Sequence, residues 1–437
     1  MADGSQYTRP EGQAQRLEKI QGRYDGWTIF AALALACIGV VMVASSSIAV
    51  AEGHGVGQFH YLTRHLVFLA AGLGMAFVVM RTELKRVESH AQLLPVVCVV
   101  LLLLVYVPGL GHEVNGARRW INLRVSNFQV VEAVKILLIV WMASYLKRFA
   151  EAVQMTWSGM LKPLGIAGVM VVLLLMQPDF GSAMLICAVV GGMLLLGGAS
   201  IPRMVAPVML AVPAIGLLAV SESYRVRRLT SFMNPWEDPF KDGFQLTQAL
   251  IAIGRGEWFG VGLGGSVQKL FYLPEAHTDF ILAVIAEELG FIGVVAIIAL
   301  FALLTWRAFS IGLRAVEMRR LFSGFIAFGI GLYISLQAFV SIGVNLGLLP
   351  TKGLTLPLIS SGGSSVLMTC VSLALLLRVG YELDRAERQV ARARGELAAE
   401  DEVPAAAPPR DADADADALR PRRGGRVRVA PTLGAQA

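Results

Sequence analysis

The chain has 437 residues, of which 55% are hydrophobic and only 16% are charged, and it carries a formal net charge of +6. A soluble protein of this length needs far more charge on its surface, so the composition excludes an ordinary soluble enzyme. Most basic residues flank apolar segments, where anionic lipid headgroups attract them, so the net charge does not imply a nucleic acid partner. The four cysteines lie inside apolar segments without metal-ligand spacing, which favours packing roles: Cys37, Cys98, Cys187 and Cys370.

Long segments with few or no charges follow one another along the chain. A hydrocarbon core of about 30 Å is crossed by a helix of roughly 20 apolar residues. We therefore predict an all-α integral membrane protein with ten transmembrane helices. The predicted spans are residues 27–51, 66–80, 91–111, 127–146, 163–178, 180–202, 204–221, 279–306, 321–351 and 353–377.

The distribution of Lys and Arg orients the predicted bundle. With both termini in the cytoplasm, the inner segments hold fifteen basic residues and the short outer loops hold five. Cytoplasmic loops carry the excess of basic residues in membrane proteins, so we predict that both termini are cytoplasmic. The predicted domains are a cytoplasmic tail (1–26), a ten-helix membrane domain (27–380) and a second cytoplasmic tail (381–437). The second tail has too little apolar content to fold alone, so we predict a largely disordered segment that is solvated or docks on a partner.

A long outer loop, at about residues 222–278, connects the seventh and eighth predicted spans. Loops of this length that are not low-complexity are usually functional. Apolar residues within it predict a short amphipathic helix on the membrane surface: Phe244, Leu246, Leu250, Ile251 and Ile253. Residues 260–265 match G-x-G-x-x-G, but without the strand and helix of a dinucleotide site they favour a tight turn. The sequence contains no Walker A motif, so a reaction on the outer face has to use an activated substrate.

The most informative stretch of this loop is Y-L-P-E-A-H-T-D-F at 272–280, which contains Glu275, His277 and Asp279. Asp279 falls where the loop enters the eighth span, so one interpretation is a helix cap or dipole partner. The alternative is a general base at the membrane–water boundary, where partial desolvation raises the pKa of a carboxyl group. His277 is a second candidate base, although a lone His in a loop more often bonds locally.

Two sets of charged residues lie near the fourth predicted span. Glu132 and Lys135 share one helix face, and charges within a bilayer normally face protein or a wet cavity. They form a mutual ion pair that locks helix packing or line a cavity near the substrate, and the two interpretations are compatible.

Arg118, Arg119 and Trp120 precede this span on the outer side, against the positive-inside tendency. They indicate a bound anion, either a phospholipid headgroup or a substrate pyrophosphate.

A Gly- and Ser-rich break, at 347–365, separates the last two predicted spans on the outer side. The last helix is expected to open at residues 362–365, with Ser364 in its first turn and Lys352 nearby. Free backbone N–H groups at a helix N-terminus favour an anion. The alternative is a break that only permits close helix packing.

Several stretches, taken in order, resemble the SEDS (shape, elongation, division and sporulation) family of peptidoglycan glycosyltransferases. They are N-G-A-R-R-W-I (115–121), F-Q-V-V-E-A-V-K (128–135), Q-P-D-F-G (177–181), 224–235, 238–245, P-E-A-H-T-D-F-I (274–281) and L-P-T-K-G-L-T-L-P (349–357). The last two are more similar to the FtsW branch of the family than to the RodA branch. The chain departs from the family pattern at Val130 and Val131, which replace Pro and Ser, and at Ser361, which replaces Tyr.

The resemblance implies an enzyme of the bacterial inner membrane, concentrated at the division site. Its substrate would be lipid II, a disaccharide-pentapeptide carried on undecaprenyl pyrophosphate. Asp279 would be the general base that deprotonates the 4-hydroxyl of the acceptor sugar. The expected substrate-binding residues are Arg119, Glu132, Lys135, Glu275, Lys352 and Ser364. Among them, the cations Arg119, Lys135 and Lys352 would stabilise the charge of the leaving group.

The resemblance also implies a class B penicillin-binding protein (an FtsI-type transpeptidase) and other division proteins as partners. A divalent cation would suit a pyrophosphate, but the sequence shows no metal-ligand cluster. A lipid II flippase and a non-enzymatic division scaffold are the alternative functions. A polymerase needs a carboxylate at Asp279 that accepts a proton, whereas a flippase or a scaffold does not.

Overall fold

The computed structural model describes residues 20–53, 55–114, 117–122, 127–220, 231–237, 239–241, 243–270, 272–351 and 353–393. Lys352 and residues 1–19 and 394–437, which hold most of the two predicted tails, lie outside the described residues. Residues 22–386 form one compact unit, and every contact discussed below lies within it.

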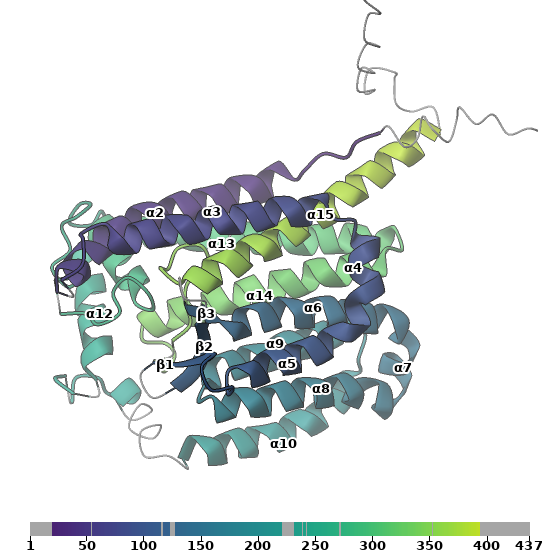
Figure 1. Cartoon of the computed structure of the whole chain (residues 1–437), viewed down its shortest axis with the longest axis horizontal. Helices are drawn as coiled ribbons and strands as arrows, with labels where there is room; N and C mark the ends of the chain where they lie inside the picture. Colours follow the sequence, from purple (N-terminus) through teal and green to yellow (C-terminus); the bar gives the residue numbers. More distant parts are fainter. Residues whose placement is uncertain are drawn as a thin grey trace, which may run out of the picture. The chain divides into compact units, whose positions relative to one another are not determined.

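A helix lies at each of the ten predicted spans (Figure 1). These helices are α2 (Gly26–Gly53), α3 (His60–Arg81), α4 (Leu84–His90) with η1 (Ala91–Leu93) and α5 (Leu94–Leu104), α6 (Val130–Arg148), α8 (Trp157–Met176), α9 (Phe180–Leu196), α10 (Ile201–Val220), α13 (Ile281–Glu317), α14 (Leu321–Asn345) and α15 (Gly363–Ala393). Within the described part of the chain, seven helices are long and apolar enough to cross a membrane, and α9 is a shorter apolar helix. The helical membrane fold is therefore confirmed, whereas the count of ten spans and the side on which each loop lies stay predictions.

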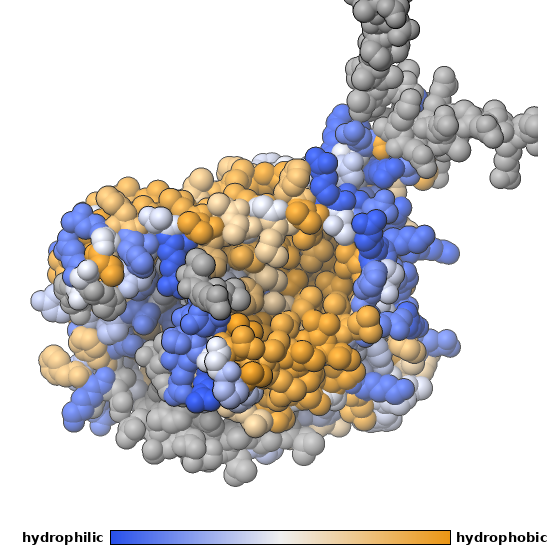
Figure 2. Space-filling model, in the orientation of Figure 1, coloured by the Kyte–Doolittle hydropathy of each residue, from blue (hydrophilic) through white to orange (hydrophobic). Residues whose placement is uncertain are grey.

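The outward surface of the helices is apolar along their middle and polar toward their ends. Figure 2 shows hydrophobic side chains over α5 and α8, between polar regions to the left and the right. Large apolar side chains on these helices are exposed, among them Val96, Val100, Val169 and Val172. A belt of this kind suits the hydrocarbon core of a bilayer.

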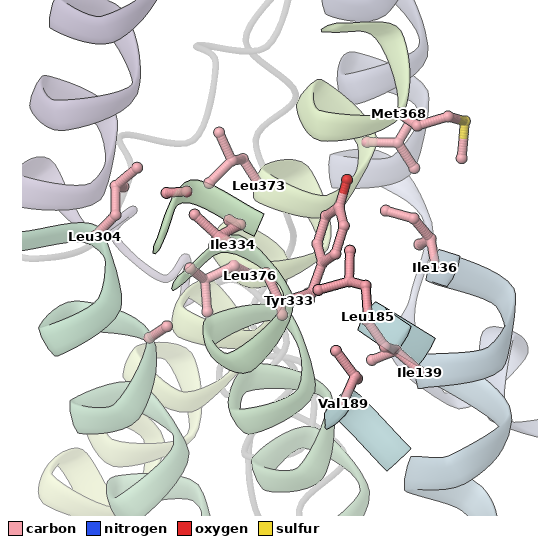
Figure 3. Close-up of a cluster of buried hydrophobic side chains, with 14 of the residues drawn as sticks. Ile136, Ile139, Leu185, Val189, Leu304, Tyr333, Ile334, Met368, Leu373 and Leu376 are labelled. Atoms are coloured by element: carbon pink, nitrogen blue, oxygen red, sulfur yellow. The ribbon is translucent and has the colours of Figure 1, made fainter. Parts of the chain in front are cut away.

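Helix α14 is the centre of the packing and contacts α6, α9 and α13. Small residues let its neighbours approach closely, as is common in membrane bundles. A Cβ on Gly329 would lie 2.5 Å from Cγ2 of Ile139, and a Cβ on Gly312 would lie 2.5 Å from the ring of Phe328. Tyr333 of α14 is fully buried among apolar side chains of α6, α9 and α15 (Figure 3).

Helix α13 is broken near its start, which the sequence did not indicate. Gly290 has φ 68° and ψ −167°, which no helix adopts, and residues 281–288 before it are all buried. The break frees two carbonyl groups, which accept hydrogen bonds from the loop: Val261 N–H to Glu287 over 2.9 Å and Gly262 N–H to Glu288 over 3.1 Å. Irregular backbone at membrane depth is tolerated where protein groups satisfy it in this way.

The tight turn predicted at residues 260–265 is confirmed. Gly260, Gly262 and Gly264 all have positive φ values, which favour glycine. A Cβ on Gly260 would lie 2.1 Å from the carbonyl oxygen of Glu288, so this position also needs glycine for close approach. The turn therefore lets the loop backbone reach the break in α13.

The connection between α5 and α6 contains a three-stranded antiparallel sheet that the sequence analysis missed. Its strands are β1 (Gly111–Val114), β2 (Ala117–Asn122) and β3 (Asn127–Gln129), in the order β1-β2-β3. Trp120 lies opposite His112 on one side and Gln129 on the other. The prediction of helix from residue 127 was wrong by three residues, because β3 leads directly into α6.

The predicted amphipathic helix of the long loop is present as α12 (Phe244–Gly256). It packs against α13, and its buried face consists of Leu246, Thr247, Ala249, Ala252 and Gly256. Ile251, counted in the predicted apolar set, is exposed. A position on the membrane surface stays a prediction.

Candidate functional site

A cavity of about 560 Å³ opens where the sheet, the start of α13 and the start of α15 meet. Four residues of the predicted site line it: Arg119, Glu275, Asp279 and Ser364. The walls also include Tyr61 and Arg64 of α3, Trp120, Asn127 and Gln129 of the sheet, and Gln245 of α12. The cavity therefore collects side chains from segments far apart in the sequence.

Asp279 lies directly before α13, and its backbone is held by Asn345 at the end of α14. The Nδ2 of Asn345 donates to the Asp279 carbonyl over 2.9 Å, and its Oδ1 accepts from the N–H of Ala283 over 3.1 Å. The N-cap position belongs to Phe280, and no side chain caps the helix from there. Asn345 thus satisfies one of the helix's first N–H groups and fixes the residue that carries the carboxylate.

The carboxylate of Asp279 points toward Gly353 in the segment before α15. A Cβ on Gly353 would lie 3.1 Å from Oδ2 of Asp279, so any larger residue there would press on the carboxylate. Asp279 is half-buried and lines the cavity. This placement suits the general-base interpretation, because the group is partly desolvated yet open to the cavity.

Two other residues of the same stretch are held by local contacts. The Thr278 hydroxyl donates to Oε2 of Glu275 over 2.6 Å, and Glu275 itself has φ 56°. His277 is buried, its ring lies 4.8 Å from that of Tyr61, and its carbonyl accepts from Ser361 N–H over 2.9 Å. His277 therefore joins α3 to the segment before α15.

Glu132 and Lys135 form a buried ion pair away from the cavity lining. Lys135 Nζ lies 2.9 Å from Oε1 of Glu132 and donates to Oε1 of Gln337 over 2.9 Å. Gln337 Nε2 in turn donates to the carbonyl of Thr355, which does line the cavity, over 3.0 Å. The ion-pair interpretation is confirmed, and neither charged residue is among the residues that line the cavity.

Arg119 lines the cavity, but carbonyl groups already engage its guanidinium. Its Nε donates to the Gln177 carbonyl over 3.0 Å and its Nη2 to the Pro178 carbonyl over 2.6 Å. Arg119 thus ties β2 to the Q-P-D-F-G turn between α8 and α9. Arg118 instead pairs with Glu113 over 3.0 Å on the exposed surface.

The Gly- and Ser-rich break brings the start of α15 to the cavity. Ser364 lines the cavity and is almost fully buried. A Cβ on Gly363 would lie 2.5 Å from the ring of Phe68 in α3, so the close-packing interpretation is confirmed. The hydroxyl of Thr355 donates to the Ser365 hydroxyl over 2.8 Å, which links the segment before α15 to the first turn of that helix. The predicted cation Lys352 lies outside the described residues.

Two fully buried carboxylates behind the cavity hold the long loop against α13. Glu287 accepts from Arg255 over 2.9 Å and from the Ser266 hydroxyl. Glu288 lies 2.7 Å from Lys269 Nζ and accepts from the Ser45 hydroxyl of α2 over 2.7 Å. Buried carboxylates are costly without such partners. No local pattern indicates these pairings, because their members are 19 to 243 residues apart.

The described residues contain no group of three or more His, Cys, Asp and Glu side chains that could hold a metal ion. The expectation of a divalent cation therefore stays open.

The family model for FtsW, RodA and SpoVE, described as "Cell cycle protein", matches residues 26–385. The chain belongs to this family. The resemblance seen in the sequence is thus confirmed over the whole helical body of the protein.

Curated relatives within the family carry the FtsW name. A Xanthomonas oryzae pv. oryzae protein named "Probable peptidoglycan glycosyltransferase FtsW" is 63% identical over 376 residues, which are 86% of this chain and 76% of the relative. A Coxiella burnetii protein of the same name is 46% identical over 370 residues, which are 85% of this chain and 100% of the relative.

Solved structures of the family share the fold. A chain described under "Structural coordination of polymerization and crosslinking by a peptidoglycan synthase complex" has a TM-score of 0.68 at 30% identity, covering 82% of this chain and 98% of that one. The Thermus thermophilus rod shape determining protein RodA has a TM-score of 0.58 at 27% identity, covering 82% of this chain and 96% of its own.

Proposed function

We propose that this protein is a peptidoglycan glycosyltransferase that polymerises lipid II into glycan strands during cell division. The names of the curated FtsW relatives support this activity. The observation that carries the proposal for the site is the carboxylate of Asp279, which lines a cavity of about 560 Å³ at a helix start fixed by Asn345.

Asp279 acts as the general base in this proposal. Its carboxylate takes the proton of the 4-hydroxyl group of the acceptor sugar as that oxygen attacks the anomeric carbon of the donor. The bond between that carbon and the pyrophosphate oxygen breaks, and undecaprenyl pyrophosphate leaves with the electron pair. General base catalysis supplies roughly 10²–10⁴ of rate, and a fixed orientation of base and substrate supplies more.

The remaining residues of the site take different roles. Ser364 and Glu275 line the cavity and present polar groups to the sugars or the peptide. Arg119 holds the sheet that forms one wall, because both of its described hydrogen bonds go to carbonyl groups. Lys135 acts at a distance, through Gln337 and the carbonyl of Thr355. Lys352 is the proposed cation for the leaving group.

The partner in this proposal is a class B penicillin-binding protein that crosslinks the new strands. The likeness to a chain described in a complex that coordinates polymerization and crosslinking supports such an assembly. We place the protein in the bacterial inner membrane at the division site, with both termini in the cytoplasm. The excess of basic residues in the inner segments supports this orientation.

The test is polymerisation of lipid II by the purified full-length protein in complex with its penicillin-binding partner. Glycan strands are expected from the wild type, and Asp279→Asn is expected to abolish them while expression and complex formation persist. Glu113→Gln is the matched control, because Glu113 is an exposed carboxylate of the same sheet region that does not line the cavity. Full activity of Asp279→Asn would remove Asp279 from catalysis. An inactive wild-type complex would favour a flippase or a scaffold.

A further inference from the structure

A second cavity, of about 230 Å³, lies at the end of α13 opposite to Asp279. It is formed by the start of α4, the end of α6, the turn between α13 and α14, and the middle of α15. Its charged lining residues are Lys85, Glu88, Lys147, Arg319, Arg320 and Glu382. None of them belongs to the site described above.

The positive charges of this cavity exceed the negative ones. Lys147 Nζ lies 2.5 Å from Oε1 of Glu88, and Arg378 Nε lies 2.9 Å from Oε1 of Glu382, so both carboxylates are neutralised. Arg320 contacts only a backbone carbonyl among the described residues, at 3.4 Å. Three cations therefore have no carboxylate partner within the described part of the chain: Lys85, Arg319 and Arg320.

Further hydrogen-bond donors meet at the same place. Helix α14 starts at Leu321, and no side chain caps it from Arg320, so its first backbone N–H groups are open to an anion. Ser323 of this first turn lines the cavity and is only 7% exposed. A serine hydroxyl at this position can donate a hydrogen bond to an anion in the cavity.

The backbone of Arg319 has a conformation that favours glycine. Its φ is 58°, in the left-handed region, and it follows α13 at the position where helices usually have glycine. The N–H of Arg319 donates to Val316 over 2.9 Å and that of Arg320 to Ala315 over 2.8 Å, which is the usual helix-ending pattern. Glycine would make the same turn with less strain, so the turn alone does not account for an arginine.

We propose that this cavity binds the phosphate group of an anionic lipid headgroup. Helix α4 begins where the apolar belt meets the polar end of the helices, which is the level of lipid headgroups (Figures 1 and 2). Leu84, Leu321 and Phe322 also line the cavity, beside the cations, and suit the glycerol and the first carbons of the lipid chains. With the predicted orientation, this is the leaflet whose anionic lipids attract basic pockets between transmembrane helices.

The experiment is native mass spectrometry of the full-length protein, released from membranes of equal phosphatidylglycerol and phosphatidylcholine content. The wild type is expected to retain phosphatidylglycerol preferentially. Lys85→Gln combined with Arg319→Gln is expected to weaken retention by about tenfold, because charge-assisted hydrogen bonds are lost. Arg319→Gly is the second variant, since it eases the turn and folds at least as well, yet also loses retention. Lys162→Gln, at an exposed basic residue of α8 outside this cavity, is the matched control.

Three outcomes would overturn the proposal. Equal retention of both lipids by the wild type would show that the cavity does not recognise the anionic headgroup. Unchanged retention by Arg319→Gly, in a protein with wild-type melting temperature, would place the lipid elsewhere. Complete displacement of the lipid by inorganic phosphate at equal concentration would assign the cavity to a free phosphate.

Discussion

The side-chain amide of Asn345 bonds to both sides of the start of α13, and its donor group holds the carbonyl of Asp279 over 2.9 Å. Asn345 is fully buried at the end of α14 and does not line the cavity. Helix α14, at the centre of the packing, therefore sets the position of the proposed base.

Replacement of Asn345 by Ala is expected to lower kcat for lipid II polymerisation by about tenfold or more, with a smaller change in KM. The change removes the hydrogen bonds of Asn345 to the Asp279 carbonyl and to the Ala283 N–H, so it frees the base to move. Asn345→Asp keeps the acceptor for Ala283 but loses the donor to Asp279, so it is expected to lose activity as well. Steady-state kinetics of the purified complex measure both variants. Wild-type kcat in both would show that Asn345 does not position the base.

Gly353→Ala tests the opposite side of the same carboxylate. The new Cβ would lie 3.1 Å from Oδ2 of Asp279, so the carboxylate has to shift by a few tenths of an ångström. We expect reduced polymerisation at an unchanged melting temperature. Gly74→Ala in α3 is the matched control, because its Cβ would meet nothing within 4 Å. Equal activity of the two variants would mean that the exact place of the carboxylate does not limit the rate.

The ion pair of Glu132 and Lys135 is expected to matter for stability more than for substrate contact. Lys135→Met leaves a buried carboxylate without its partner, which costs about 3–5 kcal/mol, whereas Lys135→Met with Glu132→Gln removes both charges and restores most of this loss. Thermal unfolding in detergent measures stability, and polymerisation of lipid II measures function. A double variant that regains stability but stays inactive would contradict a purely structural role.

The sequence predicted the features that depend on local composition. Uncharged segments predicted where helices lie, and the four glycines of residues 260–265 predicted a turn that the φ values of Gly260, Gly262 and Gly264 confirm. Arg119, Glu275, Asp279 and Ser364 were grouped by family resemblance, and the structure brings all four to one cavity. Local pattern and resemblance thus pointed to four residues that line one cavity.

Features that depend on distant partners escaped the sequence analysis. Gly290 looks like any glycine of an apolar helix, and its break is stabilised by the loop around Val261, which only the fold brings near. The sheet was not predicted because its strands are short and pair with one another within a connection between two helices. The ion pair of Lys135 with Glu132 was among the predictions, but the second partner of Lys135, Gln337, was not, because it lies 202 residues away.

The contact of Asp25 with Arg307 predicts how stability depends on pH. Burial raises the pKa of Asp25, but hydrogen bonds from Arg307 and Thr28 outweigh it and hold the pKa below its usual value of 3.8. Since the folded pKa is the lower one, the stabilisation is fully present above pH 3.8 and is lost as the pH falls through the folded pKa. Asp25→Asn is therefore expected to lower the melting temperature at pH 7 and to differ less from the wild type as the pH falls below about 4. Thermal unfolding across this pH range measures the difference in melting temperature, with Glu151→Gln, at an exposed carboxylate, as the control. A difference between Asp25→Asn and the wild type that stays constant with pH would contradict this dependence of stability on the Asp25 carboxylate.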